Sequence, residues 1–338
     1  MRFKAPRGTQ DVLPDVVQEW QWVEQEFLSL TKLYGYREIR TPTFEETELF
    51  IRTSGETSDV VSKEMYTFLD RGERNLALKP EGTAPAMRAL IEHNLCPPGV
   101  VQRLSYITPI FRYSRPQKGR YREAHQVGLE LVGSESAAAD AEVIEITYEF
   151  YRRVGLNDVQ VLLNSIGREQ CREAYREAIL QHAQSYLQGQ PEDVQARARK
   201  NSLRLLDSKD PEVQELMSSG PSILDYLEPD SRQRLDSVCE MLTSAGVPFT
   251  LSPEIVRGLD YYTETVFEVQ STQLGAQSSL CGGGRYDNLI RELGGSQTPS
   301  VGVAMGIERL LIVLEEKGLL PSPSPLDAVV AYTGDDTR

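Results

Sequence analysis

The sequence predicts an α+β fold in which an antiparallel sheet is flanked by helices and interrupted by a helical insertion. Predicted helices and strands come in groups along the chain, whereas a doubly wound parallel fold would alternate them regularly. The stretch from Gly167 to about Ala245 is almost entirely helix-forming, with many charges and a weak apolar stripe. A length of 338 residues leaves room for one large domain with an insertion, or for two domains.

Before the insertion, the chain predicts a mixture of helices and strands. Apolar residues at helical spacing predict a helix over 18–33, and Gly35 would end it as a C-terminal cap. An extended stretch over 37–44 contains Pro42, which suits an edge strand or an interface rather than a central strand. The other predicted elements are a short helix over 45–52, strands over 100–113 and 129–132, and a helix over 137–153 that Gly155 closes.

After the insertion, strand patterns return over 247–251 and continue to Val269. Small residues predict a short strand over 300–306. A helix is predicted over 307–316, because its apolar residues recur every three to four positions and so fall on one face.

The last residues predict a linker and a further domain. Pro321, Pro323 and Pro325 would make a stiff linker, and a single strand over 328–332 follows. Because one strand cannot bury a core, we expect it to begin a second domain; the alternative is a strand that adds to the main sheet. The resulting boundaries divide the chain into 1–166, 167–246, 247–320, 321–326 and 327–338.

The composition is that of an ordinary soluble globular protein, with 40% hydrophobic and 25% charged residues. The first residues lack the apolar segment of a secretory signal, and the apolar run 310–314 is too short to span a bilayer. Four scattered cysteines suit a reducing cytosol, and three histidines argue against a histidine-rich metal site. We therefore expect a cytoplasmic protein that does not enter the membrane.

Positive charge is concentrated in one segment of an otherwise acidic chain. The net charge of −14 argues mildly against a nucleic-acid partner, yet five cations lie within eleven residues. Such a cluster predicts a local anion site, and the alternative is a solvated basic loop. Its members are Arg112, Arg115, Lys118, Arg120 and Arg122.

The segment 255–269, IVRGLDYYTETVFEV, is the strongest single indication of a binding site. In its second half, side chains alternate between two faces as in a strand. A buried core strand would not normally be preceded by polar residues such as Arg257, Asp260 and Tyr262. These residues suit a pocket that holds an anion and a small polar ring. Gly258 would allow a ligand to approach closely. The alternative is an edge strand with a solvated start.

Three further clusters indicate chemistry. Glu81 and Thr83 surround a glycine and could bind an ammonium group, although such a pattern also forms turns and helix caps. Gln126 and Glu130 would share one face of a strand, where buried polar groups need partners from the protein or a ligand. Arg309 lies in the first turn of a predicted helix, whose N-terminus already favours anions.

The chain has no P-loop, no dinucleotide-binding fingerprint and no supported Ser-His-Asp pattern. If the protein uses ATP, arginines and an antiparallel sheet must hold the triphosphate. This combination resembles the class II aminoacyl-tRNA synthetases, and specifically the bacterial type of histidyl-tRNA synthetase, over essentially the whole chain. The segments that carry the resemblance are RGTQDVLP at 7–14, RTPTFEETELF at 40–50, KPEGTAP at 79–85, FRYSRPQKGRYREAHQVGLEL at 111–131, RLLDSKDPEVQEL at 204–216, RGLDYYTETVFEV at 257–269, GGGRYDNLI at 282–290 and GVAMGIERL at 302–310.

The resemblance implies two-step chemistry. L-Histidine and ATP, with Mg²⁺, would give histidyl-adenylate and pyrophosphate, after which tRNA(His) attacks the activated carboxyl. Arg112 and Arg257 would act in catalysis by holding the carboxylate and the α-phosphate, and a metal site is not assigned to any residue. The other implied contacts are Glu81, Thr83 and Gln126 to the α-amino group; Glu130, Tyr261 and Tyr262 to the imidazole; Arg120 and Arg309, with Arg112 and Arg257, to ATP; and Arg115, Gln117 and Lys118 to the tRNA acceptor end.

The resemblance also implies a domain plan and a partner. Ranges 1–166 and 247–320 would form the catalytic core, 167–246 the helical insertion domain, and 327–338 the start of a truncated anticodon-binding domain. The segment around Pro42 resembles the class II dimer-interface motif, which implies a homodimer.

Two residues depart from the family pattern. Ser114 replaces a glutamate and Ala124 replaces an aromatic that would stack on adenine, so ATP affinity is in question more than reaction type. These departures leave an alternative, a synthetase-like regulatory subunit of ATP phosphoribosyltransferase, which would bind histidine as a sensor. Arg257, Arg309, the basic loop and both histidine signatures favour the synthetase.

Overall fold

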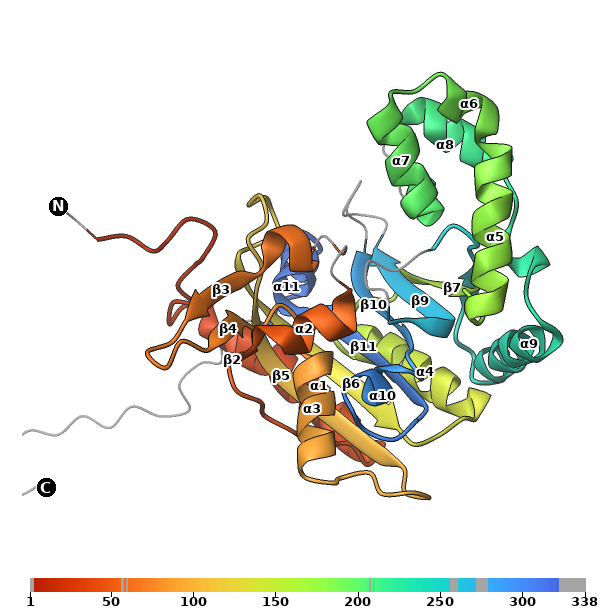
Figure 1. The fold of residues 1–338 in the computed structure, drawn as a ribbon. Helices are drawn as coiled ribbons and strands as arrows, with labels where there is room; N and C mark the ends of the chain where they lie inside the picture. Colours follow the sequence, from red (N-terminus) through yellow and green to blue (C-terminus); the bar gives the residue numbers. More distant parts are fainter. Residues whose placement is uncertain are drawn as a thin grey trace, which may run out of the picture.

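The computed structural model describes residues 3–55, 58, 60–206, 208, 210–255, 261–271 and 279–321. Within them the chain forms a large sheet, a small sheet and helices on both faces of the large sheet (Figure 1). This is the α+β architecture that the grouping of predicted elements indicated. The expected strand over 328–332, and most of the proline linker, lie outside the described residues.

The large sheet has eight strands, and its interior is antiparallel. Its order is β1-β5-β6-β11-β10-β9-β7-β8, and only the edge strands β1 and β8 pair in parallel with their neighbours among the described strands. From edge to edge the strands are β1 (Arg37–Glu38), β5 (Gln102–Phe111), β6 (Glu123–Val132), β11 (Ser300–Gly306), β10 (Ser279–Arg285), β9 (Thr263–Ser271), β7 (Val159–Ser165) and β8 (Phe249–Leu251).

Four helices cover one face of this sheet and form the main hydrophobic core with it. Alternate residues of β6, Val127, Leu129 and Leu131, point into this core, because successive strand side chains face opposite sides. The residues between them therefore face the other side of the sheet. The covering helices are α1 (Val17–Leu33), α4 (Ala137–Arg153), α9 (Pro229–Ser244) and α11 (Ile307–Glu316).

The other face of the sheet is only partly covered. Helix α3 (Thr83–Glu92) and the single turn α10 (Leu289–Glu292) pack there around a second apolar cluster. This cluster contains Tyr106, Tyr262 and Tyr286, whose hydroxyls bring polarity into it. Beside it lies the small sheet, with the order β2-β4-β3. Its strands and the adjoining helices are β2 (Phe44–Glu46), α2 (Thr47–Ser54), η1 (Val60–Glu64), β3 (Tyr66–Leu69) and β4 (Asn75–Leu78).

A run of helices separates β7 from β8 in the sequence. In Figure 1 the helices α5 to α8 extend away from the sheet, and α9 lies back against the body beside α4. The outer helices have small apolar clusters of their own. The segment consists of α5 (Glu169–His182), α6 (Gln184–Gln188), α7 (Glu192–Lys200), η2 (Ser202–Leu205), α8 (Pro211–Ser218), η3 (Ile223–Asp225) and α9.

Most predicted elements are found, and the differences have physical reasons. The helices over 137–153 and 307–316 and the strand over 300–306 have the predicted bounds. The helix predicted over 45–52 begins only at Thr47, because 44–46 pair with β4 as a strand. The strand predicted over 129–132 begins at Glu123, and its first four residues, EAHQ, include three polar ones. Apolar alternation could not reveal these residues as part of the strand.

No helix in the described ranges is both long and apolar enough to cross a membrane.

Candidate active site

A pocket of about 370 Å³ lies on the partly covered face of the large sheet. Its floor comes from β6, β10 and β11, and its walls come from the start of α3, the loop after β5 and the tyrosines before β9. Eight residues predicted for the site line it. They are Glu81, Thr83, Arg112, Arg120, Gln126, Tyr261, Tyr262 and Arg309.

Three arginines give one side of the pocket its positive charge. The Arg112 Nε donates to the Pro80 carbonyl at 2.7 Å, and Arg309 donates to the carbonyls of Gly119 at 3.2 Å and Ser279 at 2.7 Å. Arg120 instead pairs with a carboxylate outside the pocket wall. Backbone carbonyls fix the two guanidinium groups without cancelling their charge, so these groups can bind an anion.

Burial and mutual repulsion affect the charged form of these arginines. Burial lowers the pKa of Arg112 and of Arg309, and the positive charge of Arg120 lowers that of Arg309 further. Guanidinium groups nevertheless remain protonated in proteins. The unliganded pocket therefore holds like charges close together, and a bound anion would relieve their repulsion.

The opposite side of the pocket is built on Glu130, which is fully buried one layer behind the wall. Its Oε1 accepts hydrogen bonds from the Thr83 hydroxyl at 2.8 Å and the Tyr106 hydroxyl at 3.0 Å. Its Oε2 accepts a hydrogen bond from the Tyr286 hydroxyl. Glu130 is absent from the pocket lining, while Thr83 and Tyr286 are part of it. Sequence reasoning assigned Glu130 to the imidazole, and this assignment stays a prediction; in the structure Glu130 lies behind Thr83 and Tyr286.

Two glycines make room for this carboxylate network. A Cβ at Gly302 would lie 1.8 Å from the Oε2 of Glu130, and a Cβ at Gly128 would lie 2.2 Å from the ring of Tyr106. Both glycines are in the strands that pair across the pocket floor. The positions of the Glu130 carboxyl and the Tyr106 ring therefore depend on the absence of side chains at these two glycines.

Glu81 caps helix α3 and also lines the pocket. Its two oxygens accept the backbone N–H groups of Thr83 at 2.6 Å and Ala84 at 2.8 Å. Burial raises the pKa of Glu81, and these two hydrogen bonds oppose the shift. The helix-cap and the ammonium-binding interpretations of this segment are therefore compatible. A carboxylate that caps a helix can also face a pocket and remain available to a cation.

Two buried polar atoms of the lining have no hydrogen-bond partner in the described structure, the Gln126 Oε1 and the Ser114 Oγ. Buried polar atoms are normally paired, so each is a candidate contact for a ligand. Gln126 was predicted as such a contact. Ser114 and Ala124, the two departures from the family pattern, both lie in the wall.

The two adjacent tyrosines complete the wall. Tyr261 and Tyr262 have ring centroids 4.7 Å apart, and Tyr261 lies 5.6 Å from Tyr286. After them, Glu264 has a backbone φ of 51°, and the pairing of β9 with β10 shifts register at this point. This bulge interrupts the simple alternation predicted for 261–269. Arg257, with Asp260, lies outside the described residues.

The residues predicted for the tRNA acceptor end lie apart from the pocket. Arg115, Gln117 and Lys118 are exposed and do not belong to its lining, and Lys118 pairs with Glu316. Their assignment stays a prediction.

Four site residues were missed by sequence reasoning. Tyr106 and Tyr286 each donate a hydrogen bond to Glu130. Tyr286 lies in the motif GGGRYDNLI, directly after an arginine, so the sequence itself offered a reason to assign it to the site. Glu308 accepts the His125 backbone N–H at 2.9 and 3.0 Å and contacts the Nδ1 of that ring at 3.0 Å. Burial opposes the charged form of His125, but the hydrogen bond and charge of Glu308 outweigh it and raise the pKa of the ring.

Replacing Glu130 with glutamine is expected to change how stability depends on pH. Burial raises the pKa of Glu130 from an ordinary 4.5 to about 8, against hydrogen bonds that lower it. Between these values the folded protein holds a proton that the unfolded chain has released, so stability falls as pH rises. Relative to Glu130→Gln, the unmutated protein should lose up to about 1.4 kcal/mol per pH unit in this window.

Urea unfolding of both proteins between about pH 5.5 and about pH 7.5 measures this difference. A difference in unfolding free energy that stays constant with pH would show that the carboxyl is ionised in the folded protein.

An antiparallel sheet whose open face carries an arginine-lined pocket is the arrangement of class II aminoacyl-tRNA synthetases that the motifs implied. A sequence profile described as histidyl-tRNA synthetase matches residues 8–310. The histidine–tRNA ligase of a Cyanothece species is 50% identical over 96% of this chain and 75% of its own length. That of a Geobacillus species is 47% identical over 100% of this chain and 81% of its own length.

Solved structures agree with these sequence relationships. The apo histidyl-tRNA synthetase of S. aureus is 37% identical, with a TM-score of 0.76 over 94% of this chain and 75% of its own. A Bacillus halodurans protein described as an ATP phosphoribosyltransferase regulatory subunit/histidyl-tRNA synthetase shares the fold at 24% identity, with a TM-score of 0.68 over 95% of this chain and 84% of its own. The chain belongs to the histidyl-tRNA synthetase family.

Proposed function

We propose that this chain is a histidine–tRNA ligase that activates L-histidine with ATP and transfers it to tRNA(His). The observation that carries the proposal is the pocket itself, which joins an arginine side to a hydroxyl and carboxylate side. The first side suits phosphates and a carboxylate, and the second suits an ammonium group and an imidazole. A histidine and an ATP molecule present these groups together.

The first step needs positioning and charge stabilisation more than proton transfer. The histidine carboxylate is already ionised, so its oxygen can attack the α-phosphorus while the bond to the bridging oxygen breaks and pyrophosphate leaves. Arg112 would hold the carboxylate and the α-phosphate, with Arg257 in the same role. Arg309 and Arg120 would stabilise the charge of the leaving phosphates.

The amino acid would be recognised on the carboxylate side. Glu81, Thr83 and Gln126 would bind the α-amino group, and the unpaired Gln126 Oε1 supports this role. Imidazole has one donor and one acceptor, so Tyr262 and the hydroxyls anchored on Glu130 can satisfy both nitrogens. A site built in this way rejects analogues that lack these groups by roughly 10⁴–10⁵.

Mg²⁺ would enter with ATP, because this ion is usually bound through substrate phosphates and few carboxylates. The described ranges hold no group of three or more His, Cys, Asp or Glu side chains that could bind a metal by themselves. We therefore assign no step to residues that would hold the ion.

A homodimer is the proposed assembly, with the small sheet at the interface. Phe44, Phe68 and Leu69 of this sheet are 51%, 41% and 68% exposed, and the first two rings contact each other edge to edge. Exposed apolar groups gathered in this way suit a protein interface. Sedimentation of the unmutated chain at micromolar concentration should give the mass of two chains, and a monomer there would contradict the proposal.

Histidine-dependent exchange of pyrophosphate into ATP tests the proposed reaction. We expect exchange in the unmutated chain at saturating histidine and ATP. Histidine binding in calorimetry without any exchange would contradict the ligase and favour the alternative, a non-catalytic histidine sensor in ATP phosphoribosyltransferase regulation. Omitting histidine is the matched control, because exchange that continues without histidine cannot come from histidine activation.

A further inference from the structure

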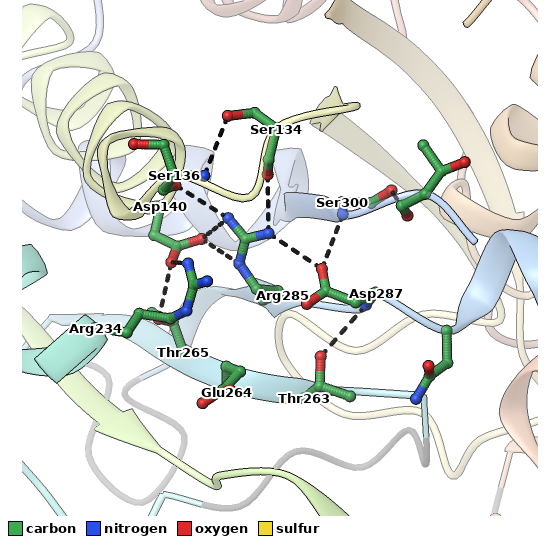
Figure 2. Close-up of polar contacts among 12 residues, drawn as sticks. Ser134, Ser136, Asp140, Arg234, Thr263, Glu264, Thr265, Arg285, Asp287 and Ser300 are labelled. Carbon is green, nitrogen blue, oxygen red and sulfur yellow. Dashed lines mark hydrogen bonds and ion pairs between the residues drawn. The ribbon is translucent and has the colours of Figure 1, made fainter. Parts of the chain in front are cut away.

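A fully buried arginine lies directly behind the carboxylate side of the pocket. Arg285 is the last residue of β10, and its side chain points toward Asp140 of helix α4 (Figure 2). Its Nε and Nη2 lie 2.9 and 2.7 Å from the Oδ1 of Asp140, which is also fully buried. Its Nη1 donates to the Ser134 carbonyl at 3.0 Å, and its Nη2 donates to the Ser136 carbonyl at 3.3 Å.

The second oxygen of Asp140 connects two further elements. The Thr265 hydroxyl of β9 donates to the Oδ2 at 3.1 Å, and the Arg234 Nη1 of helix α9 lies 3.5 Å from the same oxygen (Figure 2). One carboxylate of α4 therefore joins β9, β10 and α9. Helix α9 is the last element of the helical segment that follows β7, so the network reaches into that segment.

The same arginine fixes the backbone on both sides of Tyr286. The Arg285 Nη1 donates to the Asp287 Oδ1 at 3.1 Å, and that oxygen also accepts the Ser300 backbone N–H at 3.0 Å. The Tyr286 backbone N–H donates to the Ser300 carbonyl at 2.8 Å. The Asp287 backbone N–H donates to the Thr263 hydroxyl at 3.3 Å. Tyr286 is thereby held between two fixed neighbours, with its hydroxyl on Glu130.

The energetics favour a geometric role for this ion pair. Removing two charges from water costs about as much as their attraction returns, so apolar residues would stabilise the fold at least as well. The donors of Arg285 nevertheless reach helix α4, the loop that precedes it and the turn after β10, so they fix three parts of the chain relative to one another. Such a network restricts a side chain to one orientation.

We propose that the Asp140–Arg285 pair positions Tyr286 and Glu130 for histidine binding, and that Arg234 makes this position depend on helix α9. The inference rests on the proposed function, because it assigns histidine to this side of the pocket. Arg234, Asp140 and Arg285 are positioning residues that do not touch the ligand. The histidine site is then sensitive to the placement of a helix outside the sheet.

Arg234→Met tests the part of the proposal that concerns helix α9. Methionine keeps an unbranched side chain of similar length, and Asp140 keeps its pairing with Arg285, so the fold should tolerate the replacement. Arg232→Met is the matched control, because Arg232 lies on the same helix, is 53% exposed and pairs with Asp236 at the surface. In pyrophosphate exchange we expect Arg234→Met to raise the KM for histidine about fivefold, with the KM for ATP unchanged. The control should change neither.

A double-mutant cycle separates positioning from general damage. Tyr286→Phe removes the hydroxyl that reaches Glu130, so adding Arg234→Met to it should raise the histidine KM by less than in the unmutated background. Asp140→Asn should raise the histidine KM about tenfold or more, if the variant folds. The Arg234 cycle does not depend on that variant.

Two results would overturn the positioning role. One is a histidine KM within twofold of the unmutated value in Arg234→Met; the other is an equal rise of the histidine and ATP KM values. Both are distinct from a failure of the proposed function, in which the unmutated chain itself shows no exchange.

Discussion

Replacing Arg112 with alanine is expected to reduce kcat/KM for ATP in pyrophosphate exchange by about 10²–10³, the usual cost of losing a preorganised group that stabilises developing charge. Arg112 lies in the pocket wall, and its Nε is fixed by the Pro80 carbonyl. The remaining guanidinium nitrogens are therefore oriented before the ligand arrives. Arg257→Ala should lower the rate in the same way, on the role that its sequence motif implies.

Arg112→Lys should be as slow as Arg112→Ala. A planar guanidinium group can donate to a carbonyl and bind an anion at the same time, and an ammonium group lacks this fixed arrangement of donors. Arg103→Ala is the matched control. Arg103 lies on β5, the strand that Arg112 directly follows, but it pairs with Glu142 away from the pocket. Exchange at the unmutated rate in Arg112→Ala would remove this arginine from the mechanism.

Replacing Gly302 with alanine is expected to destabilise the protein by about 2–4 kcal/mol and to abolish histidine binding. The new Cβ would lie 1.8 Å from the Oε2 of Glu130 and 2.6 Å from the Leu129 carbonyl. The backbone neighbour cannot move without breaking the ladder between β11 and β6. The carboxylate must therefore leave its place beside Tyr286.

Gly306→Ala, at the end of the same strand, is the control for this prediction. A Cβ there meets nothing within 4 Å, and its φ of −85° suits alanine. Urea unfolding of both variants gives the comparison of stability, and calorimetry of the Gly302→Ala variant against the unmutated protein measures the loss of histidine binding. Equal stability of the two variants would show that the strands can separate at little cost.

The sequence predicted the elements whose patterns are local. The helix over 137–153 has a capping Ser136 whose hydroxyl accepts the Ala138 N–H, and the helix over 307–316 has an apolar face, so both could be bounded from the chain alone. Strand β7 and the small sheet were not predicted. Their pairing is with strands distant in the sequence, and such context overrides local preference.

The candidate site was also predicted only in part. Charged, aromatic and other polar residues of the motifs were assigned to the pocket, and eight of them line it. The layer behind them was not predicted, because nothing near Tyr106 or Asp140 in the sequence shows that β5 and α4 come within reach of Glu130 and Arg285. The depth of Glu130 in particular follows from three hydroxyl donors on separate elements.

Part of the pocket floor is bare backbone, since Gly282 and Gly302 contribute to its lining. A surface formed by backbone is shaped by the hydrogen-bonded ladder of the sheet rather than by side chains. Every possible replacement at these positions adds atoms, because no residue is smaller than glycine. The space that the pocket offers a ligand can therefore only shrink when these positions change.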